Sequence, residues 1–471
     1  MTQRCWLNRL ISSVSVTLLC ASACVPRPEY ECSSNAQCIS DSHEQGVCLP
    51  DARCAYSDTA CSDTGLRYSS QAGADAATCT PRNPAGDCLV QVTLGINFSC
   101  ALKSDGSVWC WGVNDHGQLG DGQPAGDFSA SPRRVALPAN FTATEIGAGE
   151  IHACALSKSD GVWCWGGGES LQLGRGIDDA KDHSTPVEAI FPSQALPVHS
   201  LAVGAAHNCV VDQVGTVWCW GENDHNEAGQ NPGLPCPLGG DSEPCQDVPI
   251  PTPVASDLSA ISVVSGDEFS CAIDDLSELR CWGDNSLGEL GIGTTTPHTT
   301  ELAQMSGMGS FLTVDSDRGV PMIALGAEHG CVVTGGSVQC WGSNAAGQVG
   351  LGSKSASEPT PHFVEISHSV FAGSMAKHTC SVDSDSGHVA CWGANADGQL
   401  GLAHVEEVLV PTDIPIAGAR KVALGASHSC VLIGTGALYC WGSNTEGELG
   451  VTPSRVESSP IVSDALAAIC R

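Results

Sequence analysis

The chain is poor in aromatic and charged residues. Phenylalanine, tyrosine and tryptophan make up 5% of its 471 residues, and charged side chains make up 15%. Basic residues are the scarcest of the charged groups, with 20 lysines and arginines against 52 aspartates and glutamates and a formal net charge of −32. A chain without a basic patch cannot neutralise phosphates, so nucleic acid is excluded as a partner.

Motifs for catalysis and for membrane spanning are also missing from the sequence. It has no Gly-x-Ser-x-Gly elbow, no phosphate-binding loop and no His-Glu-x-x-His motif. We therefore assign no catalytic residue, no cofactor and no metal ligand. The apolar stretch at residues 10–19 is too short to span a bilayer. We expect a non-enzymatic protein that reaches a membrane only through a lipid at its N-terminus.

The N-terminus has the features of an export signal. Arg4 and Arg9 precede the apolar stretch and form a positively charged region. Ala21-Ser22-Ala23-Cys24 then resembles a bacterial lipobox, in which the cysteine receives a lipid. Alanine replaces the usual leucine three residues before Cys24, so cleavage without lipidation stays open. We expect a signal peptide over residues 1–23 and an outer-membrane or cell-surface lipoprotein, with secretion or a periplasmic location as the alternative.

Residues 24–86 form a cysteine-rich module and linker. Small polar segments of this kind bury too little apolar surface to fold without covalent cross-links, and an exported chain enters an oxidising compartment. No Cys-x-x-Cys pair is present, so disulfides are favoured over zinc. The six cysteines allow fifteen pairings, among which the sequence does not choose. They are Cys32, Cys38, Cys48, Cys54, Cys61 and Cys79.

The rest of the chain, residues 87–471, contains seven copies of Cys-Trp-Gly. They recur every 49 to 62 residues and begin at Cys110, Cys164, Cys219, Cys281, Cys340, Cys391 and Cys440. Repetition at this period is typical of a propeller or solenoid. Each triplet has a second cysteine nine to eleven residues upstream, at Cys100, Cys154, Cys209, Cys271, Cys331, Cys380 and Cys430.

The two cysteines of each copy fit opposite positions of a β-hairpin. Loop length changes with their separation: Gly335-Gly336 forms a two-residue loop, whereas three-residue loops end in Gly106, Gly215 and Gly436. Each pair then lies three steps from its loop, in a non-hydrogen-bonded pair with Cα atoms ~4.5 Å apart, which a disulfide can bridge. We predict one disulfide per copy. The fourth loop, Asp275-Leu276-Ser277, lacks the glycine.

The motif Gly-x-x-His-x-Cys-x-Leu, followed by Cys-Trp-Gly-x-Asn-x-x-Gly-Gln-Leu-Gly, resembles the regulator of chromosome condensation repeat. The best copies are residues 112–120 and 393–401. The resemblance implies an all-β, seven-bladed β-propeller with about four short strands per blade, here in an exported bacterial lipoprotein version. The second copy departs at Gly168 and Leu171 and the third at Asn226 and Ala228, which puts the shape of those loops in doubt.

Four cysteines of the propeller region lie outside the hairpins. Cys236 and Cys245 flank a proline-rich insertion, and we expect them to close one loop. Cys88 precedes the first copy and Cys470 is next to the C-terminus. Because a closed propeller brings its two ends together, a Cys88–Cys470 disulfide would lock the ring.

Aromatic and apolar side chains supply the candidate binding residues. The tryptophans of the seven triplets are expected to pack between blades. Trp109, Trp163 and Trp218 are additional and could form an exposed patch on the first three blades. The two longest connections, residues 229–266 and 291–326, could form a binding rim, with simple loop drift as the alternative. The second of them carries Met305, Met308 and Phe311.

A histidine precedes the first hairpin cysteine in five copies, and phenylalanine replaces it in the other two. The histidines are His152, His207, His329, His378 and His428; the replacements are Phe98 and Phe269. A ring of imidazoles can bind a metal. One structural hydrogen bond per blade explains a position that recurs in the family repeat more simply.

These features together favour a monomeric, exported binding scaffold that recognises a protein or glycan at the cell envelope. The eukaryotic founder of the family acts on a small GTPase and chromatin, which an exported acidic chain would not meet. A secreted bacterial propeller of the family inhibits β-lactamases, so an inhibitor of an exported enzyme is one alternative. An envelope polysaccharide lyase or hydrolase is the other, and it would need converging acid and base residues.

Overall fold

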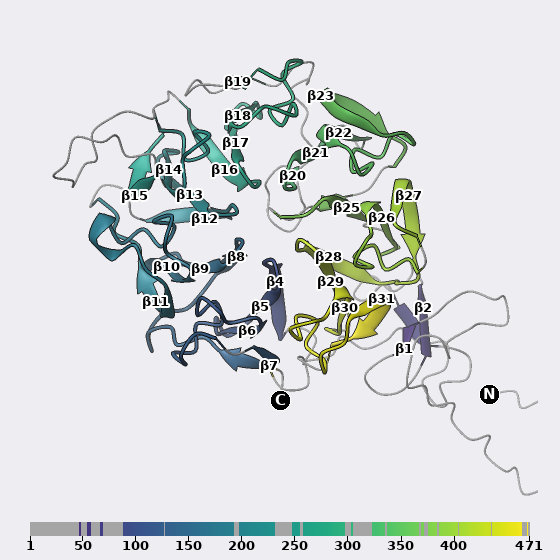
Figure 1. The fold of residues 1–471 in the computed structure, drawn as a ribbon, viewed down its shortest axis with the longest axis horizontal. Coiled ribbons are helices and arrows are strands. Elements are labelled where there is room, and N and C mark those ends of the chain that lie inside the picture. Colours follow the sequence, from purple (N-terminus) through teal and green to yellow (C-terminus); the bar gives the residue numbers. More distant parts are fainter. Residues whose placement is uncertain are drawn as a thin grey trace, which may run out of the picture.

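The computed structural model describes residues 88–463 except 127, 193–196, 231–246, 255–257, 297–302, 305–322, 335–336, 367–368, 372–374, 384–385, 404 and 435. It also describes residue 469 and three short strands near the N-terminus. Seven four-stranded antiparallel sheets stand in a ring (Figure 1). The prediction of an all-β, seven-bladed propeller is therefore confirmed.

The strands follow one another from the axis of the ring to its rim. Blade 1 contains β4 (Leu89–Leu94), β5 (Phe98–Lys103), β6 (Val108–Gly112) and β7 (Ser129–Arg134). Blade 2 contains β8 (Glu145–Ala148), β9 (His152–Ser157), β10 (Gly161–Gly166) and β11 (His183–Glu188). Blade 3 contains β12 (Val198–Val203), β13 (His207–Asp212), β14 (Val217–Gly221) and β15 (Val248–Pro253). Blade 4 contains β16 (Ala260–Ser265), β17 (Phe269–Asp274), β18 (Leu279–Gly283) and β19 (Ala303–Gln304).

The remaining blades repeat this order. Blade 5 contains β20 (Ile323–Leu325), β21 (His329–Thr334), β22 (Ser337–Asn344) and β23 (Ser355–Val364). Blade 6 contains β24 (Ser369–Phe371), β25 (His378–Val382), β26 (Val389–Ala394) and β27 (Glu407–Ile414). Blade 7 contains β28 (Ala419–Leu424), β29 (His428–Ile433), β30 (Leu438–Ser443) and β31 (Val456–Val462). The innermost strands β4 and β28 lie side by side where the ring closes (Figure 1).

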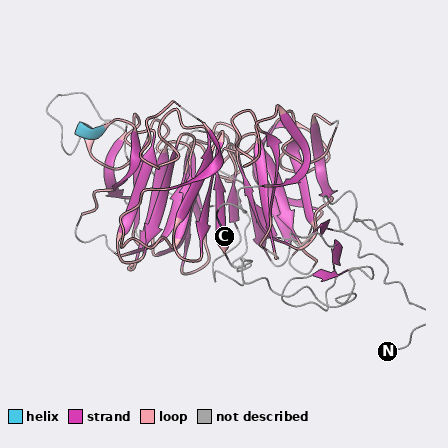
Figure 2. Ribbon diagram, turned by 90° about the horizontal axis from the view of Figure 1, so that it is seen from below, coloured by secondary structure: helices cyan, strands magenta, loops and turns pink. Residues whose placement is uncertain are grey.

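Three further strands precede the propeller. β1 (Val47–Cys48), β2 (Cys54–Ser57) and β3 (Leu66–Tyr68) form a small antiparallel sheet in which Cys48 is opposite Cys54. The described residues contain one short 3-10 helix, η3 (Ile177–Asp179), between β10 and β11 (Figure 2). Within the same residues we find no helix with the length and apolar character needed to cross a membrane.

Every blade has a disulfide between its second and third strands, as predicted. The paired cysteines are directly opposite in the strand register, and their Cα atoms are 4.0 to 4.1 Å apart. The pairs are Cys100–Cys110, Cys154–Cys164, Cys209–Cys219, Cys271–Cys281, Cys331–Cys340, Cys380–Cys391 and Cys430–Cys440. Cys88 is disulfide-bonded too, but Cys470, its predicted partner, lies outside the described residues.

The hairpin loops have the predicted lengths. Thr334 pairs with Ser337 around the two-residue loop, and Gly106, Gly215 and Gly436 adopt φ angles of 80° to 87°. In blade 4 the left-handed position is filled by Ser277, whose φ is 62°. L-residues with a Cβ avoid this region. Asp274 holds the loop, because its Oδ1 accepts hydrogen bonds from the backbone N–H groups of Leu276 and Glu278, at 3.0 and 2.8 Å.

The glycine of each Cys-Trp-Gly triplet is required by a β-bulge. All seven glycines have φ angles between 97° and 110°, and in six of the blades, all except blade 4, the register between the third and fourth strands shifts beside them. At Gly112, a Cβ would come within 2.4 Å of the carbonyl oxygen of Asn97. Only glycine fits this approach of two backbones.

The tryptophans of the triplets join neighbouring blades, as expected. All seven are at most 1% exposed. Each indole N–H donates to a backbone carbonyl of the preceding blade, at 2.6 to 2.9 Å. The accepting residues are the Gln or Glu of the Gly-Gln-Leu-Gly motif: Gln118, Gln172, Glu227, Glu289, Gln348, Gln399 and Glu448.

The two divergent motif loops keep the common shape, contrary to the doubt raised by their sequences. Leu171 and Asn226 replace glycine but adopt φ angles of 59° and 68°. Gly174 N–H still donates to Leu171, as Gly120 N–H does to Gly117, in both cases at 2.9 Å. The packing of the loop under the next tryptophan thus overrides the preference of these residues for negative φ.

Candidate partner-binding face

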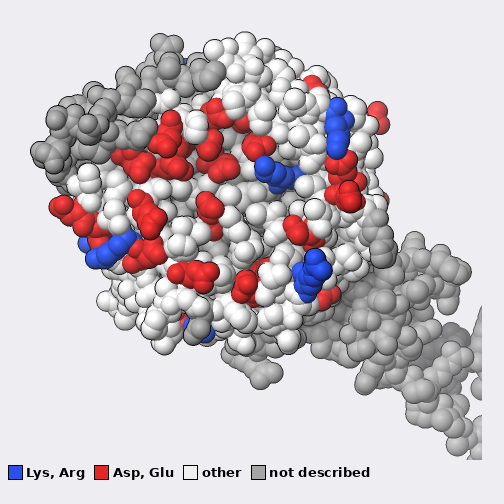
Figure 3. Space-filling model, viewed as in Figure 1, with Lys and Arg blue, Asp and Glu red and all other residues white. Residues whose placement is uncertain are grey.

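The connections of each blade open alternately on two faces. Those between first and second strands and between third and fourth strands share one face, which we call the upper face. The helix η3 belongs to it and is at the top of Figure 2. Figure 3 looks down on this face and shows many acidic and few basic side chains.

Eight carboxylates from the loops of blades 2 to 5 form what we call the acidic sector of the upper face. Glu150, Asp267, Glu268 and Glu328 come from connections between first and second strands. The other four, from connections between third and fourth strands, are Glu222, Asp224, Asp247 and Asp284. Their loops are fixed to each other: Glu150 N–H donates to Ala205 O at 2.8 Å and Asp284 N–H to Glu268 O at 2.8 Å.

The carboxyl of Asp267 is repelled by several other carboxylates of the sector. Burial is the main cause that raises the pKa of its carboxyl to about 7, and four neighbours add to it by charge repulsion. In decreasing order these are Glu268, Glu150, Glu328 and Glu222. They come from blades 2, 3, 4 and 5, so the closure of the ring, and not the order of residues, brings these charges together.

Three further carboxyls of the sector, those of Asp247, Glu222 and Glu268, have raised pKa values. Burial, followed by repulsion from Asp224, raises the pKa of Asp247 to about 6. Burial also raises the pKa of Glu222 and of Glu268. The side chain of His225 opposes the shift at Glu268, and its Nδ1 is 3.3 Å from Oε2.

A buried glutamate lies under the sector. Glu227 is 0% exposed, and its Oε2 accepts the His225 backbone N–H at 2.9 Å, whereas its Oε1 has no hydrogen-bond partner among the described residues. Burial raises its pKa to about 8, and Glu222 and Glu268 add repulsion. In blade 7 the equivalent Glu448 Oε1 accepts a hydrogen bond from Ser443 at 2.6 Å. Glu222, a member of the sector, occupies the Ser443 position in blade 3.

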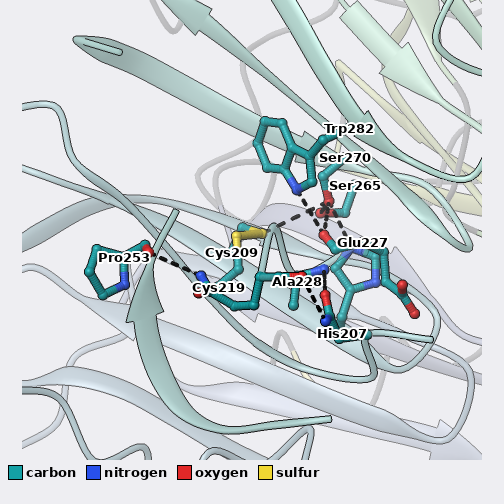
Figure 4. The surroundings of a disulfide bond; sticks show 11 residues. His207, Cys209, Cys219, Glu227, Ala228, Pro253, Ser265, Ser270 and Trp282 are labelled. Carbon is teal, nitrogen blue, oxygen red and sulfur yellow. Dashed lines mark hydrogen bonds between the residues drawn. A yellow bond between two sulfur atoms is a disulfide. The ribbon is translucent and has the colours of Figure 1, made fainter. Parts of the chain in front are cut away.

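The backbone of Glu227 belongs to a repeated contact that we call the inter-blade clasp (Figure 4). Its carbonyl accepts hydrogen bonds from Trp282 Nε1 at 2.9 Å and from Ser270 Oγ at 3.3 Å. Ser270 Oγ is also 2.7 Å from His207 Nε2 of the preceding blade. The clasp ties blade 3 to blade 4 directly beneath the acidic sector.

Five of the seven blade junctions have this clasp. The histidine of one blade bonds to a hydroxyl or amide of the next, at 2.7 to 3.1 Å. The pairs are His152–Asn208, His207–Ser270, His329–Thr379, His378–Ser429 and His428–Ser99. At the two remaining junctions Phe98 and Phe269 replace the histidine, and Ala153 and Gly330 occupy the position of the hydroxyl or amide. Phe98 and Ala153 belong to one buried cluster.

The five histidines are therefore structural. Each is 0% exposed, and burial lowers their pKa values to about 3 or 4, so their imidazoles are neutral at neutral pH. Asn208 Oδ1 can only accept, so His152 Nε2 carries the proton. Among the described residues, no three His, Cys, Asp or Glu side chains are grouped to hold a metal.

The additional tryptophans do not form one exposed patch. Trp218 is 4% exposed and its indole N–H donates to Asp212 at 2.9 Å, so the prediction of an exposed side chain is wrong there. Trp163 is half-buried, in edge-to-face contact with Phe141, and Trp109 is half-buried, 3.3 Å from Ser107 Oγ. Burial of an indole ring is favourable where its N–H group finds a hydrogen-bond acceptor, as at Trp218 and Trp109.

Several predicted residues cannot be compared with the structure because they lie outside the described residues. These are Cys24, Cys236, Cys245, Met305, Met308, Phe311 and Cys470. The rim of the two long connections thus stays a prediction. Sequence analysis missed the acidic sector, although aligning the seven copies shows paired acids in blades 3 and 4, Glu222 with Glu227 and Asp284 with Glu289.

Comparison with known proteins agrees with this architecture. The family model described as the RCC1-like domain matches residues 57–379, more than half of the chain. The chain belongs to the RCC1-like domain family. Models of the regulator of chromosome condensation (RCC1) repeat match residues 386–432 and 419–448, in blades 6 and 7.

Relatives of this RCC1-like chain include proteins of very different size. The ultraviolet-B receptor UVR8 of Arabidopsis thaliana is 28% identical over 68% of this chain and 68% of its own length. The E3 ubiquitin-protein ligase HERC2 of Mus musculus is 27% identical over 72% of this chain, but the match spans only 6% of that ligase.

Solved structures show the same fold at lower identity. Yeast RCC1 (Prp20), solved in complex with Kap60, is 22% identical with a TM-score of 0.61 over 72% of this chain and 78% of its own. Human WBSCR16 is 20% identical with a TM-score of 0.63 over 76% of this chain and 94% of its own.

Proposed function

We propose that this chain is an exported, non-enzymatic binding scaffold, anchored by a lipid on Cys24, that recognises a protein at the cell envelope. The observation that carries the proposal is the disulfide in every blade. Disulfides form and persist in oxidising compartments, so seven regular ones fit an exported protein. They also make a rigid platform, on which loops bind with little loss of conformational entropy.

Binding is favoured over catalysis by the distribution of polar groups. The buried histidines are occupied by inter-blade clasps, and the carboxyls of the acidic sector are spread over the loops of four blades. A receptor is among the relatives, which agrees with a recognition role. The ligase activity named for HERC2 is not transferred, because the shared region is a small part of that protein.

Anchoring is tested by expressing the full chain in a bacterium that processes lipoproteins. We expect the mature wild type in the membrane fraction with a lipid-modified Cys24, and the Cys24→Ala variant to lose both the modification and the membrane association. Release of an unmodified chain cleaved after Ala23 would instead support secretion or a periplasmic location.

Partner recognition is tested by pull-down from envelope extract with the oxidised full chain. A variant without residues 235–246 serves as the comparison for the rim. A partner captured by the wild type and lost in the variant would support a loop-directed scaffold. A partner kept by both would place the site elsewhere on the propeller than residues 235–246, and capture of none would contradict a protein-binding role.

A further inference from the structure

We propose that the acidic sector is the docking site for a lysine- or arginine-rich segment of the partner protein. This inference rests on the proposed binding role and names the partner chemistry and the surface. The sector has eight carboxylates within the loops of four consecutive blades, and the chain as a whole supplies few basic residues to balance them.

The charge of the sector is largely uncompensated in the described structure. Two ion pairs reach it, His225–Glu268 at 3.3 Å and Lys377–Glu328 at 2.9 Å. The carboxyl of Asp267 has four acidic neighbours that oppose its ionisation. Carboxylates held together against their repulsion destabilise the free protein, and a cationic partner would remove that penalty on binding.

Glu227 gives an independent reason to expect a cation here. Its Oε1 is buried and has no hydrogen-bond partner among the described residues, whereas the equivalent atom of Glu448 has the Ser443 hydroxyl. The equivalent Gln172 Oε1 of blade 2 also has no partner, but it belongs to a neutral amide and not to an acid. Native proteins rarely leave a buried polar atom unsatisfied without a functional reason. A cation held at Glu222, which occupies the Ser443 position, would face this oxygen and stabilise both carboxylates.

The spread of the sector selects the kind of cation. A divalent ion needs several ligands within coordination distance, and the described residues contain no group of three that could hold one. Glu150, Asp267, Glu328 and Glu222 instead belong to four different blades. Several positive charges spaced along a polypeptide match this arrangement, whereas acidic lipids and nucleic acids would be repelled.

The loops are fixed before any partner arrives. Glu222 N–H donates to Ala206 O at 3.0 Å, Asp284 N–H donates to Glu268 O at 2.8 Å, and Asp267 N–H reaches Ala327 O of the next blade at 3.3 Å. The clasp between His207 and Ser270 holds the two central blades below them. A preorganised charged surface increases both association rate and selectivity.

The test measures binding of a basic probe to the full oxidised chain. The probe is a fluorescent peptide of about ten residues with alternating lysine and serine, and a twin with glutamate in place of lysine is its control. Binding is followed by anisotropy at about 50 mM and about 300 mM NaCl, since an electrostatic contact weakens as the Debye length shortens. We expect the lysine peptide to bind and the glutamate twin not to bind.

The site is located with two matched triple variants. Glu222→Gln/Asp267→Asn/Glu268→Gln removes three charges from the sector, and Asp105→Asn/Asp160→Asn/Glu278→Gln removes three from loops on the opposite face. We expect about tenfold weaker binding in the first variant and less than about twofold in the second. Thermal unfolding checks that both variants are folded.

Three results would overturn the inference: no binding of the lysine peptide at low salt, equal losses in both triple variants, or sector-dependent binding of Ca²⁺ or Mg²⁺ without binding of the peptide. The last result would identify a metal site. Failure of the proposed function is distinguishable, because it appears as the absence of an envelope partner in the pull-down. A partner captured equally by wild type and by the sector variant would leave the scaffold role standing and refute only this site.

Discussion

Glu227 is one of three residues, with Glu289 and Glu448, that place a glutamate at the glutamine position of the repeat. Blades 1, 2, 5 and 6 place glutamine at this position, namely Gln118, Gln172, Gln348 and Gln399. A glutamine is neutral at every pH, but a buried glutamate must either carry its charge without solvation by water or keep its proton. The raised pKa of Glu227 shows that the folded state favours the protonated form.

Replacing Glu227 by glutamine is expected to stabilise the protein at alkaline pH. The folded-state pKa of about 8 is above the ordinary value of 4.5, so the stability contributed by the protonated group is lost as pH rises from about 4.5 to about 8. Glu227→Gln removes this loss and should raise the unfolding free energy by roughly 2–4 kcal/mol at pH 8 and by little at pH 4.5.

Denaturant unfolding of wild type and variant at both pH values is the measurement. Glu448→Gln is the matched control, because its Oε1 already has a partner in Ser443. An equal gain at both pH values would show that the effect comes from packing and not from ionisation.

Ser277 is the other residue held in an unfavourable state. Its left-handed φ is imposed by the three-residue loop, in which blades 1, 3 and 7 have glycine. We expect Ser277→Gly to raise the unfolding free energy by roughly 0.5–1 kcal/mol, because relief of left-handed strain exceeds the added flexibility of glycine. The reciprocal Gly215→Ser should lower it by a similar amount. Loss of stability in Ser277→Gly would mean that the serine makes a contact worth more than the strain.

At the scale of structural elements, the inter-blade clasp divides the junctions into two kinds. Histidine bonds to a hydroxyl or amide, and where phenylalanine replaces histidine the partner position holds alanine or glycine, so the two positions vary together. A buried imidazole without its partner would have an unsatisfied Nε2–H group. A hydroxyl that faced a phenyl ring would in turn be buried against an apolar surface. The residue at one clasp position therefore determines which residue at the other can both complete the hydrogen bonds and fill the available volume.

A double-mutant cycle tests this coupling at the blade 3–blade 4 junction. His207→Phe and Ser270→Ala should each lower the unfolding free energy by about 1–3 kcal/mol, since each removes a buried hydrogen bond and Ser270→Ala leaves His207 Nε2 without its partner. The double variant recreates the Phe98–Ala153 combination and should lose less than the sum by about 1 kcal/mol or more. Additive losses would show that the two positions do not act as a pair.

At the scale of the whole molecule, the ring is closed between blade 7 and blade 1. His428 contacts Ser99, Trp111 donates to Glu448, and Ile469 is buried in a cluster with Leu89 and Cys88 beside it. Cys88 at the start of the first blade is disulfide-bonded, and its partner is outside the described residues. The first strand and the last residues of the chain therefore depend on each other.

We predict that non-reducing peptide mapping will find Cys88 linked to Cys470. Replacing both by serine should lower the unfolding free energy by roughly 4–6 kcal/mol in the chain-entropy model for so long a loop. The seven hairpin disulfides should contribute less each, because their loops are short. A peptide joining Cys88 to a cysteine of residues 24–86 would disprove this closure.

Local patterns predicted most of the fold. The spacing of Cys100 and Cys110, the position of Gly106 and the Cys-Trp-Gly triplet all depend on a few neighbouring residues, and the structure confirms them. Burial of Trp218 was not predictable, because it is set by the packing of neighbouring elements. The acidic sector was missed for the same reason: Glu150 and Glu328 are far apart in sequence, and only the curvature of the ring brings them to one side.

The direction of the clasp limits how such a ring can grow by duplication. Blades 3, 6 and 7 each offer a polar side chain to the blade before and an imidazole to the blade after, so a tandem copy of any of them would match its parent. A tandem copy of blade 2 would set His152 against Ala153, and one of blade 4 would set Phe269 against Ser270. A blade like blade 2, with histidine followed by a small residue, or like blade 4, with phenylalanine followed by a polar residue, can be gained or lost only together with a compatible neighbour. For such blades the unit of duplication is a pair of adjacent blades.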